Sequence, residues 1–250
     1  MIGLGLNATK TPTTNTNIVK SVDAGGGERG SSSSLVNALV LRHDYKDRPV
    51  EPVSSGAASF NGAEDEVVIG DVIDFGAEDF SITAWVKILD TTSISGETYI
   101  ASKVVDTNNI IKLAFNYDND KFVMTATAGG NSIVGNSTST ALTSSLKGQW
   151  NHIAFTCDRD GKSSVYINGS TDTYGVSVNS LNSSQNLDNT GGWAIGGRDG
   201  HVSGNFEGYI CNVGMWKGAA LSQPQIKSIM NKNYAALSAS EKEDLVSWWN

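Results

Sequence analysis

Hydrophobic and polar residues alternate most regularly in the stretch EDFSITAWVKILD, in the first half of the chain. An alternation with a period of two is typical of a β-strand that buries one of its faces. We therefore predict a strand over residues 80–88. Its inward face would carry Phe80, Ile82, Ala84, Val86 and Ile88, and its other face Ser81, Thr83, Trp85 and Lys87.

Two hairpins follow from the same kind of pattern. In IIKLAFNYDNDKFVMTATA, Leu113, Phe115 and Tyr117 share one face, and the residues 118–120 form a turn before Phe122, Met124 and Ala126 return. In QWNHIAFTCDRDGKSSVYINGS, WNHIAFTC and SSVYI are the two strands and DRDGK is the loop. Asn168-Gly169 then offers a favoured tight turn into a further strand.

Shorter strands complete an all-β pattern. LVLRHDY (39–45), the stretch from Glu66 to Ile69, GGWAIGGRD (191–199) and NFEGYICNVGMW (205–216) each have strand character. Many short strands separated by turn signals favour a β-sandwich.

Helices are expected only near the end of the chain. LSQPQIKSIMNKN has a capping box, Ser222 with Gln225, and Pro224 in its first turn. SASEKEDLVSWWN is expected to form a second short helix that carries Leu245, Trp248 and Trp249. The two adjacent tryptophans should either pack back onto the domain or lead into a further element.

Three segments are expected. Residues 1–34 are polar, rich in Gly and Ser and poor in aromatic residues, as in a low-complexity arm that cannot fold alone. The tip of this arm carries Ile2, Leu4 and Leu6, which could contact a partner and serve assembly. Residues 35–235 would form the sandwich, and residues 236–250 a C-terminal helical segment.

Composition narrows the class of protein. The chain has 250 residues, 39% of them hydrophobic, and a net charge of −8. It shows no basic patch of the kind that nucleic-acid binding requires. No stretch approaches the roughly 20 apolar residues of a membrane span. MIGLGLNATK lacks the basic region of a signal peptide, so we expect synthesis and folding in a cytoplasm.

The two cysteines, Cys157 and Cys211, are too few for a disulfide framework or a cysteine-based zinc site. We expect both to be buried small hydrophobic residues. The alternative is a bond between them.

Several motifs in a fixed order resemble those of laminin-G-like, concanavalin A-like domains. They are SFNGAEDEVVIG, DFSITAWVKI, YIASK, GQWNHIAFTCDRDGKSSVYINGS, AIGGR and FEGYICNVGMWKGAALSQPQIKSI, over about residues 56–232. The resemblance implies a jelly-roll sandwich of two antiparallel sheets. The series NVGMWKGAALSQPQIKSIMNKNY with LVSWWN is similar, more narrowly, to laminin-G-like proteins of bacteriophage virions.

The resemblance makes the stretch around His152 a structural strand. Trp150 and His152 would lie on one face, and Ile153, Phe155 and Cys157 on the other. We expect His152 to be a partly buried histidine with its hydrogen bonds satisfied.

Enzymatic chemistry finds no support in the sequence. Glycosidases need two carboxylates beside the scissile bond. The family's acidic strand motif is absent here, because Glu64 and Glu66 are followed on the same face by Val68 and Gly70. A nucleophile elbow is also missing, and His43, His152 and His201 stand in no catalytic motif. We therefore expect no enzyme and no catalytic residues.

Calcium and glycans are the two ligands that the resemblance suggests. Asp65 stands where the family commonly has an Asp near a calcium site, but Cys211 and Asn212 replace two family carboxylates. Tyr99, Tyr174, Asn189 and Trp193 are the candidates for glycan binding, with core or turn packing as the alternative.

The combined expectation is a non-enzymatic structural or surface protein of a virion, such as a capsid decoration or a fibre-like component. It would be a homo-oligomer, dock on virion or capsid subunits through its arm, and could also adhere to cell-surface glycan. The alternative is a carbohydrate-binding, lectin-like module outside a virion. A glycoside hydrolase is the third possibility.

Overall fold

A computed structural model describes residues 52–54, 56–89, 94–139, 141–142, 146–177, 185–201 and 203–250. For Asn136 and residues 173–177 it describes the backbone alone. The predicted arm with Ile2, Leu4 and Leu6, the predicted strand 39–45 and the predicted boundary at residue 35 lie outside the described residues.

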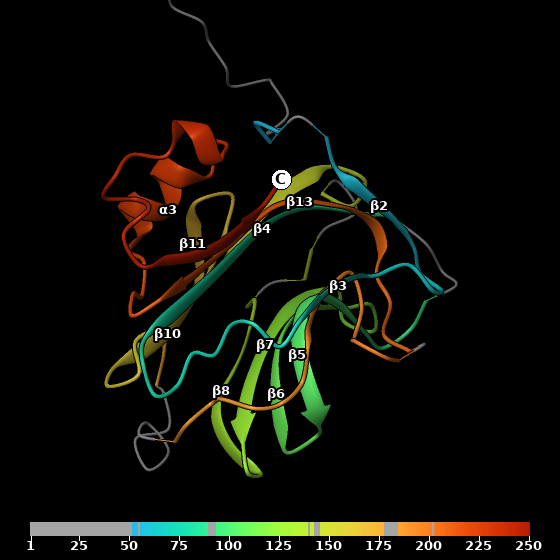
Figure 1. The fold of residues 1–250 in the computed structure, drawn as a ribbon. Coiled ribbons are helices and arrows are strands. Elements are labelled where there is room, and N and C mark those ends of the chain that lie inside the picture. Colours follow the sequence, from blue (N-terminus) through green and yellow to red (C-terminus); the bar gives the residue numbers. More distant parts are fainter. Residues whose placement is uncertain are drawn as a thin grey trace, which may run out of the picture. The chain divides into compact units, whose positions relative to one another are not determined.

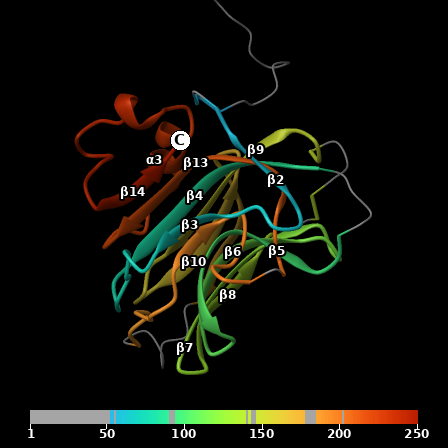
Figure 2. The same ribbon diagram turned by 45° about the vertical axis from the view of Figure 1, so that its right-hand side comes forward.

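The strands form two antiparallel sheets that face each other (Figures 1 and 2). The first has the order β11-β10-β9-β4-β13-β14, with β2 also paired to β13. Its strands are β2 (Ala58–Asn61), β4 (Phe80–Ile88), β9 (Trp150–Cys157), β10 (Lys162–Ile167), β11 (Ser170–Ser177), β13 (Glu207–Lys217) and β14 (Leu245–Trp249).

The second sheet has the order β3-β12-β5-β6-β7-β8. Its strands are β3 (Val67–Gly70), β5 (Glu97–Asp106), β6 (Asn109–Asn116), β7 (Lys121–Ala128), β8 (Asn131–Ser137) and β12 (Trp193–Ile195). The main hydrophobic core joins the two sheets, with Ile82 and Phe155 from the first and Leu113 and Phe122 from the second. The predicted all-β sandwich of two antiparallel sheets is confirmed.

The predicted hairpins are also confirmed. β6 and β7 pair through a turn that ends at Asp120, whose φ of 56° is left-handed. β9 pairs with β10, and β10 with β11 across Asn168-Gly169. Both turn residues have positive φ, 50° and 73°, as a type I′ turn requires. Cys157 and Cys211 are buried free cysteines, so no bond joins them.

The prediction that β4 buries only one face is wrong. Every residue of the strand except Lys87 is buried, because the chain after β13 covers much of the sheet's outer face. A second cluster unites Trp216 of β13 with Leu221, Ile226, Ile229 and Leu237, and a third unites Trp85 with Cys211 and Met230. The Trp85 Nε1 donates to the Met230 carbonyl at 2.8 Å.

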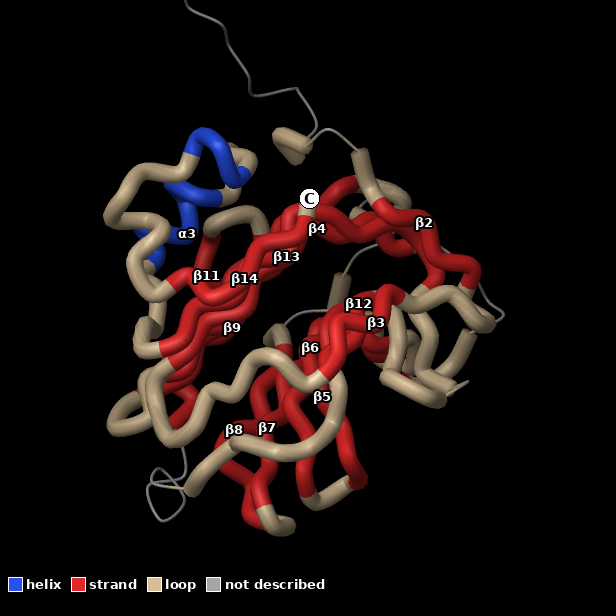
Figure 3. The backbone as a smooth tube through the Cα atoms, in the orientation of Figure 1, coloured by secondary structure: helices blue, strands red, loops and turns tan. Residues whose placement is uncertain are grey.

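The covering segment begins with helix α3 (Gln223–Ile229), as predicted. Gln225 Oε1 accepts hydrogen bonds from the backbone N–H of Ser222 at 2.9 Å and from its hydroxyl at 2.6 Å. Figure 3 shows α3 beside β11 and β13, on the outside of the sandwich. None of the helices among the described residues has the length and apolar character that crossing a bilayer requires.

The prediction of a second helix over residues 238–250 is wrong. A 3-10 turn, η2, covers Tyr234–Ala236, and Lys242 and Glu243 then close a single helical turn onto Ser238 and Ala239. Asp244 turns the chain with a φ of 62°, and LVSWW becomes β14, antiparallel to β13. As a strand, this segment pairs with the open edge of β13 and packs on the apolar surface beside it. A five-residue extension of the helical turn would be only marginally stable.

Candidate functional site

A shallow groove of about 350 Å³ lies beside β14. Its lining combines two aromatic side chains, two aliphatic ones, a hydroxyl and an amide. These are Tyr234, Leu245, Val246, Ser247, Trp248 and Asn250. The volume is within the usual range for sites that bind small molecules.

Local contacts fix the walls of this groove. Asn233 caps η2 by accepting a hydrogen bond from the Ala236 N–H at 3.1 Å, and this places Tyr234. On the other side, Trp248 packs edge-to-face against the buried Trp216, with ring centroids 6.1 Å apart. The groove is therefore built on a rigid sheet edge and a capped turn.

Glu241 anchors the segment between η2 and β14. Its carboxylate accepts hydrogen bonds from Lys232 Nζ at 2.6 Å and from the Ser228 hydroxyl at 2.6 Å, and also one from the Ser238 N–H. Burial alone would raise the pKa of Glu241, but these hydrogen bonds outweigh it and lower that pKa to about 2. The group is thus a structural anion at neutral pH.

The chemistry of the groove suits a ligand with both an apolar face and polar edges. Tyr234 is 48% exposed, and Lys242 Nζ lies 4.5 Å from its ring centroid. Trp248 Nε1 donates to Asn250 Oδ1 at 2.8 Å, which orients the amide. Aromatic rings with polar tips and a cation present the mixture of stacking surface and hydrogen-bonding groups that a sugar ring can use.

Trp193, a predicted glycan contact, is fully buried, so this prediction is wrong. It lies in β12, between β3 and β5, and its ring meets Phe75 edge-to-face with centroids 5.7 Å apart. Its Nε1 donates to the Ile73 carbonyl at 2.8 Å. The side chain has no surface left for a ligand.

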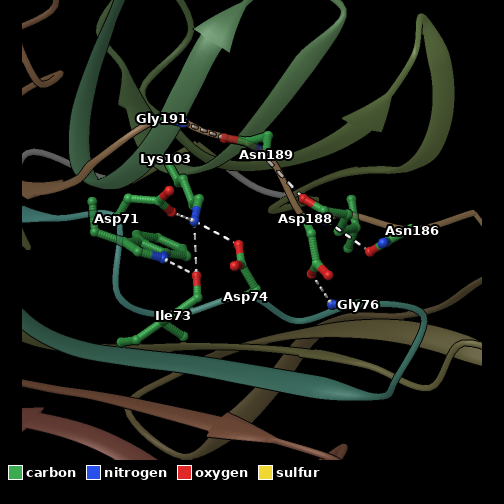
Figure 4. Close-up of polar contacts among 11 residues, drawn as sticks. Asp71, Ile73, Asp74, Gly76, Lys103, Asn186, Asp188, Asn189 and Gly191 are labelled. Atoms are coloured by element: carbon green, nitrogen blue, oxygen red, sulfur yellow. Dashed lines mark hydrogen bonds and ion pairs between the residues drawn. The ribbon is translucent and has the colours of Figure 1, made fainter.

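The other glycan candidates do not gather with it. Asn189 stabilises a turn, because its Oδ1 accepts from the Gly191 N–H at 2.9 Å (Figure 4). Tyr99, in β5, is half-buried, and Lys112 Nζ lies 5.5 Å from its ring centroid. Tyr174 lies in β11 of the other sheet, and its side chain is outside the described residues.

Sequence reasoning missed a buried ion cluster next to Trp193. The Lys103 side chain is fully buried, and its Nζ lies 2.5 Å from Asp71 Oδ1 and 2.6 Å from Asp74 Oδ1 (Figure 4). It also donates to the Ile73 carbonyl at 3.1 Å. An ammonium group therefore occupies this cage of oxygens, and the site is structural. The pair of aspartates in DVIDFG was the available signal.

The candidate calcium residue Asp65 is an exposed turn residue. Its Oδ2 accepts from the Asn61 N–H at 3.0 Å, while Asn61 Oδ1 accepts from the N–H groups of the same turn. Within the ranges that the structure describes, no three His, Cys, Asp or Glu side chains gather so that they could hold a metal ion. Asp65 and its neighbours in this turn therefore do not fit the calcium site that the resemblance implied.

The acid pair considered for catalysis and His152 belong to different sheets of the sandwich, and His43 lies outside the described residues. Glu64 and Glu66 both precede β3, which starts at Val67, so the strand does not present them side by side. His152 is 2% exposed, and its ring centroid lies 5.4 Å from that of Trp85. Burial lowers the pKa of His152 to about 3. Its Nδ1 has no hydrogen-bond partner among the described residues, which differs from the expected satisfied histidine.

Comparisons with solved structures agree with the sandwich. Domain 4 of AbnA, an arabinanase from Geobacillus stearothermophilus solved with arabinotriose, is 22% identical with a TM-score of 0.51. The match covers 72% of this chain and 80% of that domain. The receptor-binding domain of botulinum neurotoxin D is 17% identical with a TM-score of 0.55, and 74% of this chain matches 46% of that one.

The serotype D ligand-binding domain in complex with N-acetylneuraminic acid gives the same identity and TM-score. These likenesses concern the fold. A search of curated proteins finds no match. A family model, Laminin_G_3 of the concanavalin A-like lectin/glucanases superfamily, matches residues 61–227, and the chain therefore belongs to this family.

Proposed function

We propose that this chain is a non-catalytic adhesion module that binds glycan in the groove beside β14. The carrying observation is the groove itself, where Tyr234 is 48% exposed next to Trp248, Ser247 and Asn250. The similar structures support this proposal, since an arabinanase domain was solved with arabinotriose and a neurotoxin domain with N-acetylneuraminic acid. A glycoside hydrolase ranks lower because the described residues offer no pair of acids that supports it.

Tyr234→Ala is expected to weaken glycan binding by about tenfold or more, because it removes the most exposed stacking surface of the groove. Binding would be measured on a glycan array and then by calorimetry, with arabino-oligosaccharides and sialylated glycans among the probes. Tyr209→Ala is the matched control, since Tyr209 is 37% exposed on β13 but does not line the groove. An equal loss of glycan binding in both variants, or a loss in the control alone, would show that the groove is not the glycan-binding site.

We further propose that the module works on the surface of a virion, as a decoration or fibre-like component. The support is the similarity of the segment from NVGMWKGAALSQ to LVSWWN to virion proteins. In the structure this segment is one unit, since β13, α3 and β14 pack together around Trp216. A lectin-like module outside a virion is the alternative proposal. Docking would use the arm and its apolar residues Ile2, Leu4 and Leu6.

Removal of residues 1–34 is expected to convert a defined oligomer into a monomer. An arm that orders on a neighbouring subunit offsets its entropy loss by burying apolar side chains there. Light scattering after size exclusion gives the mass of the whole chain and of a version that starts at Leu35. A full-length variant with Ile2→Ser, Leu4→Ser and Leu6→Ser distinguishes the effect of the apolar tip from that of the length of the arm. A whole chain that is already monomeric would rule out self-assembly through the arm.

A further inference from the structure

β3 (Val67–Gly70) is an edge strand of the second sheet and lies next to β12 (Figure 3). In the described part of the chain it pairs with β12 alone. An edge strand presents unpaired N–H and C=O groups along its free side, and these groups can pair with a strand of another chain. Gly70, with a φ of 88°, turns the chain, and the Val72 N–H then donates to the Gly70 carbonyl at 3.1 Å. The free edge is therefore four residues long.

Apolar side chains are exposed along this edge. The described residues include eight exposed large hydrophobic side chains, and three of them, Val67, Val68 and Val72, lie within six consecutive positions. Val68 is 55% exposed and Val72 is 67% exposed. Many proteins protect an exposed edge strand with a lysine or a proline, and VVIG contains neither. The edge of β3 is thus both unpaired and apolar, as in sites that accept an added strand.

Acidic residues flank this edge at both ends. They are Glu64, Asp65 and Glu66 before β3, and Asp71 and Asp74 after it. The last two carboxylates share the single ammonium group of Lys103, which leaves one net negative charge. Because both aspartates remain partly exposed, a partner can still reach them. A basic side chain of a partner would therefore meet uncompensated negative charge.

The same charges disfavour a second copy of this chain on the edge. In the antiparallel register that pairs all four residues of β3 with those of its copy, Glu66 of one chain faces Asp71 of the other. Like charges directly opposite each other in a sheet are destabilising. The acids thus act against self-pairing and favour a segment whose ends are basic.

We propose that the free edge of β3 binds an extended peptide segment of another protein, in which apolar and polar residues alternate between two basic ends. Main-chain hydrogen bonds to β3 add one strand to the second sheet, and the apolar side chains pack against the exposed valines. The basic ends meet the acidic residues on either side of β3. This surface is separate from the groove beside β14, which belongs to the first sheet.

The test uses the whole chain and the labelled peptide KTVTVTK. The matched peptide ETVTVTE reverses both end charges and keeps the strand-forming middle. Fluorescence anisotropy is expected to show saturable binding of KTVTVTK and at least about tenfold weaker binding of ETVTVTE. Equal binding of the two peptides would overturn the proposal. So would the absence of saturable binding of KTVTVTK up to about 1 mM.

Val68→Lys is expected to weaken the binding of KTVTVTK by at least about tenfold, because it places a lysine on the free edge. Val53→Lys is the matched control. It adds the same charge at a valine that is also exposed, but the Val53 carbonyl accepts from Asn212 of β13, in the first sheet. The affinity of this control should stay within about twofold of the wild type. Val72→Lys, at a still more exposed position, repeats the test if Val68→Lys fails to fold.

Equal weakening in Val68→Lys and Val53→Lys would show that the net charge of the chain, and not the edge of β3, attracts the peptide. A concentration-dependent dimer of the wild type that Val68→Lys abolishes would identify a second copy as the occupant. Light scattering of both proteins after size exclusion detects such a dimer. Either result would overturn the proposal.

Discussion

Lys103→Met is expected to lower the free energy of unfolding by about 2 to 3 kcal/mol. The ammonium group of Lys103 is the shared hydrogen-bond donor of Asp71, Asp74 and the Ile73 carbonyl. Methionine keeps most of the buried stem but offers no donor, so these three acceptors lose their common partner. The effect stays below that of a fully buried ion pair because Asp71 and Asp74 are 46% and 42% exposed and can regain water.

Denaturant unfolding of the variant and the wild type at neutral pH measures this difference. Lys112→Met is the matched control on the next strand, where Lys112 pairs with Glu97 at a partly exposed position. The free energy of unfolding of this control should fall by less than about 1 kcal/mol. A smaller loss for Lys103→Met than for Lys112→Met would show that the buried cage contributes no net stability.

Acidification from about pH 7 to about pH 5 is expected to lower the free energy of unfolding by about 2 kcal/mol through His152 alone. Burial lowers the pKa of His152 from 6.5 to about 3 in the folded protein. Below pH 6.5 the unfolded chain therefore binds a proton that the folded chain does not accept. Stability that is present above this pH is lost as the pH falls. The total loss in the free energy of unfolding approaches about 4 to 5 kcal/mol near pH 3.

Denaturant unfolding between about pH 7 and pH 5 isolates this group. Glu241 loses its stabilising contribution only below its unfolded pKa of 4.5, and the pKa of Glu66, which burial raises, acts in the opposite direction near that value. His152→Gln should remove most of the pH dependence, whatever its own cost at neutral pH. His201→Gln, at an exposed position, should retain it. Equal pH slopes for His152→Gln and the wild type would contradict the assignment.

Lys103 and Trp193 share one hydrogen-bond acceptor. Both side chains donate to the Ile73 carbonyl, which ties the segment before β4 to β5 and β12. Nothing in the residues near Trp193 distinguishes an indole that binds a ligand from one that fills the core. That choice depends on which face of β12 turns inward, and therefore on the pairing of β12 with β3 and β5.

The C-terminal stretch shows where local pattern fails. SASEKEDL has charges and a cap that suit a helix, and Ser238 and Glu241 do form one turn in the protein. The rest pairs with β13 because an open sheet edge and the Trp216 ring lie next to it. The stabilisation of β14 comes from residues that are distant in sequence. A short segment of the chain therefore does not reveal it. The groove beside Tyr234 is a product of the same pairing.

Local chemistry determined the strand of Phe80–Ile88, the two hairpins, the Asn168-Gly169 turn and the capped helix after Ser222. Hydrophobic periodicity and backbone preference act over a few residues, so the sequence alone is enough to predict these elements. The order of the motifs in the sequence also identified the laminin-G-like, concanavalin A-like family. Tertiary structure decided the burial of Trp193, the cage around Lys103, and the place of β3 at a free edge of the second sheet. Each of these depends on contacts between strands distant in sequence, and only the packed sheets bring those strands together.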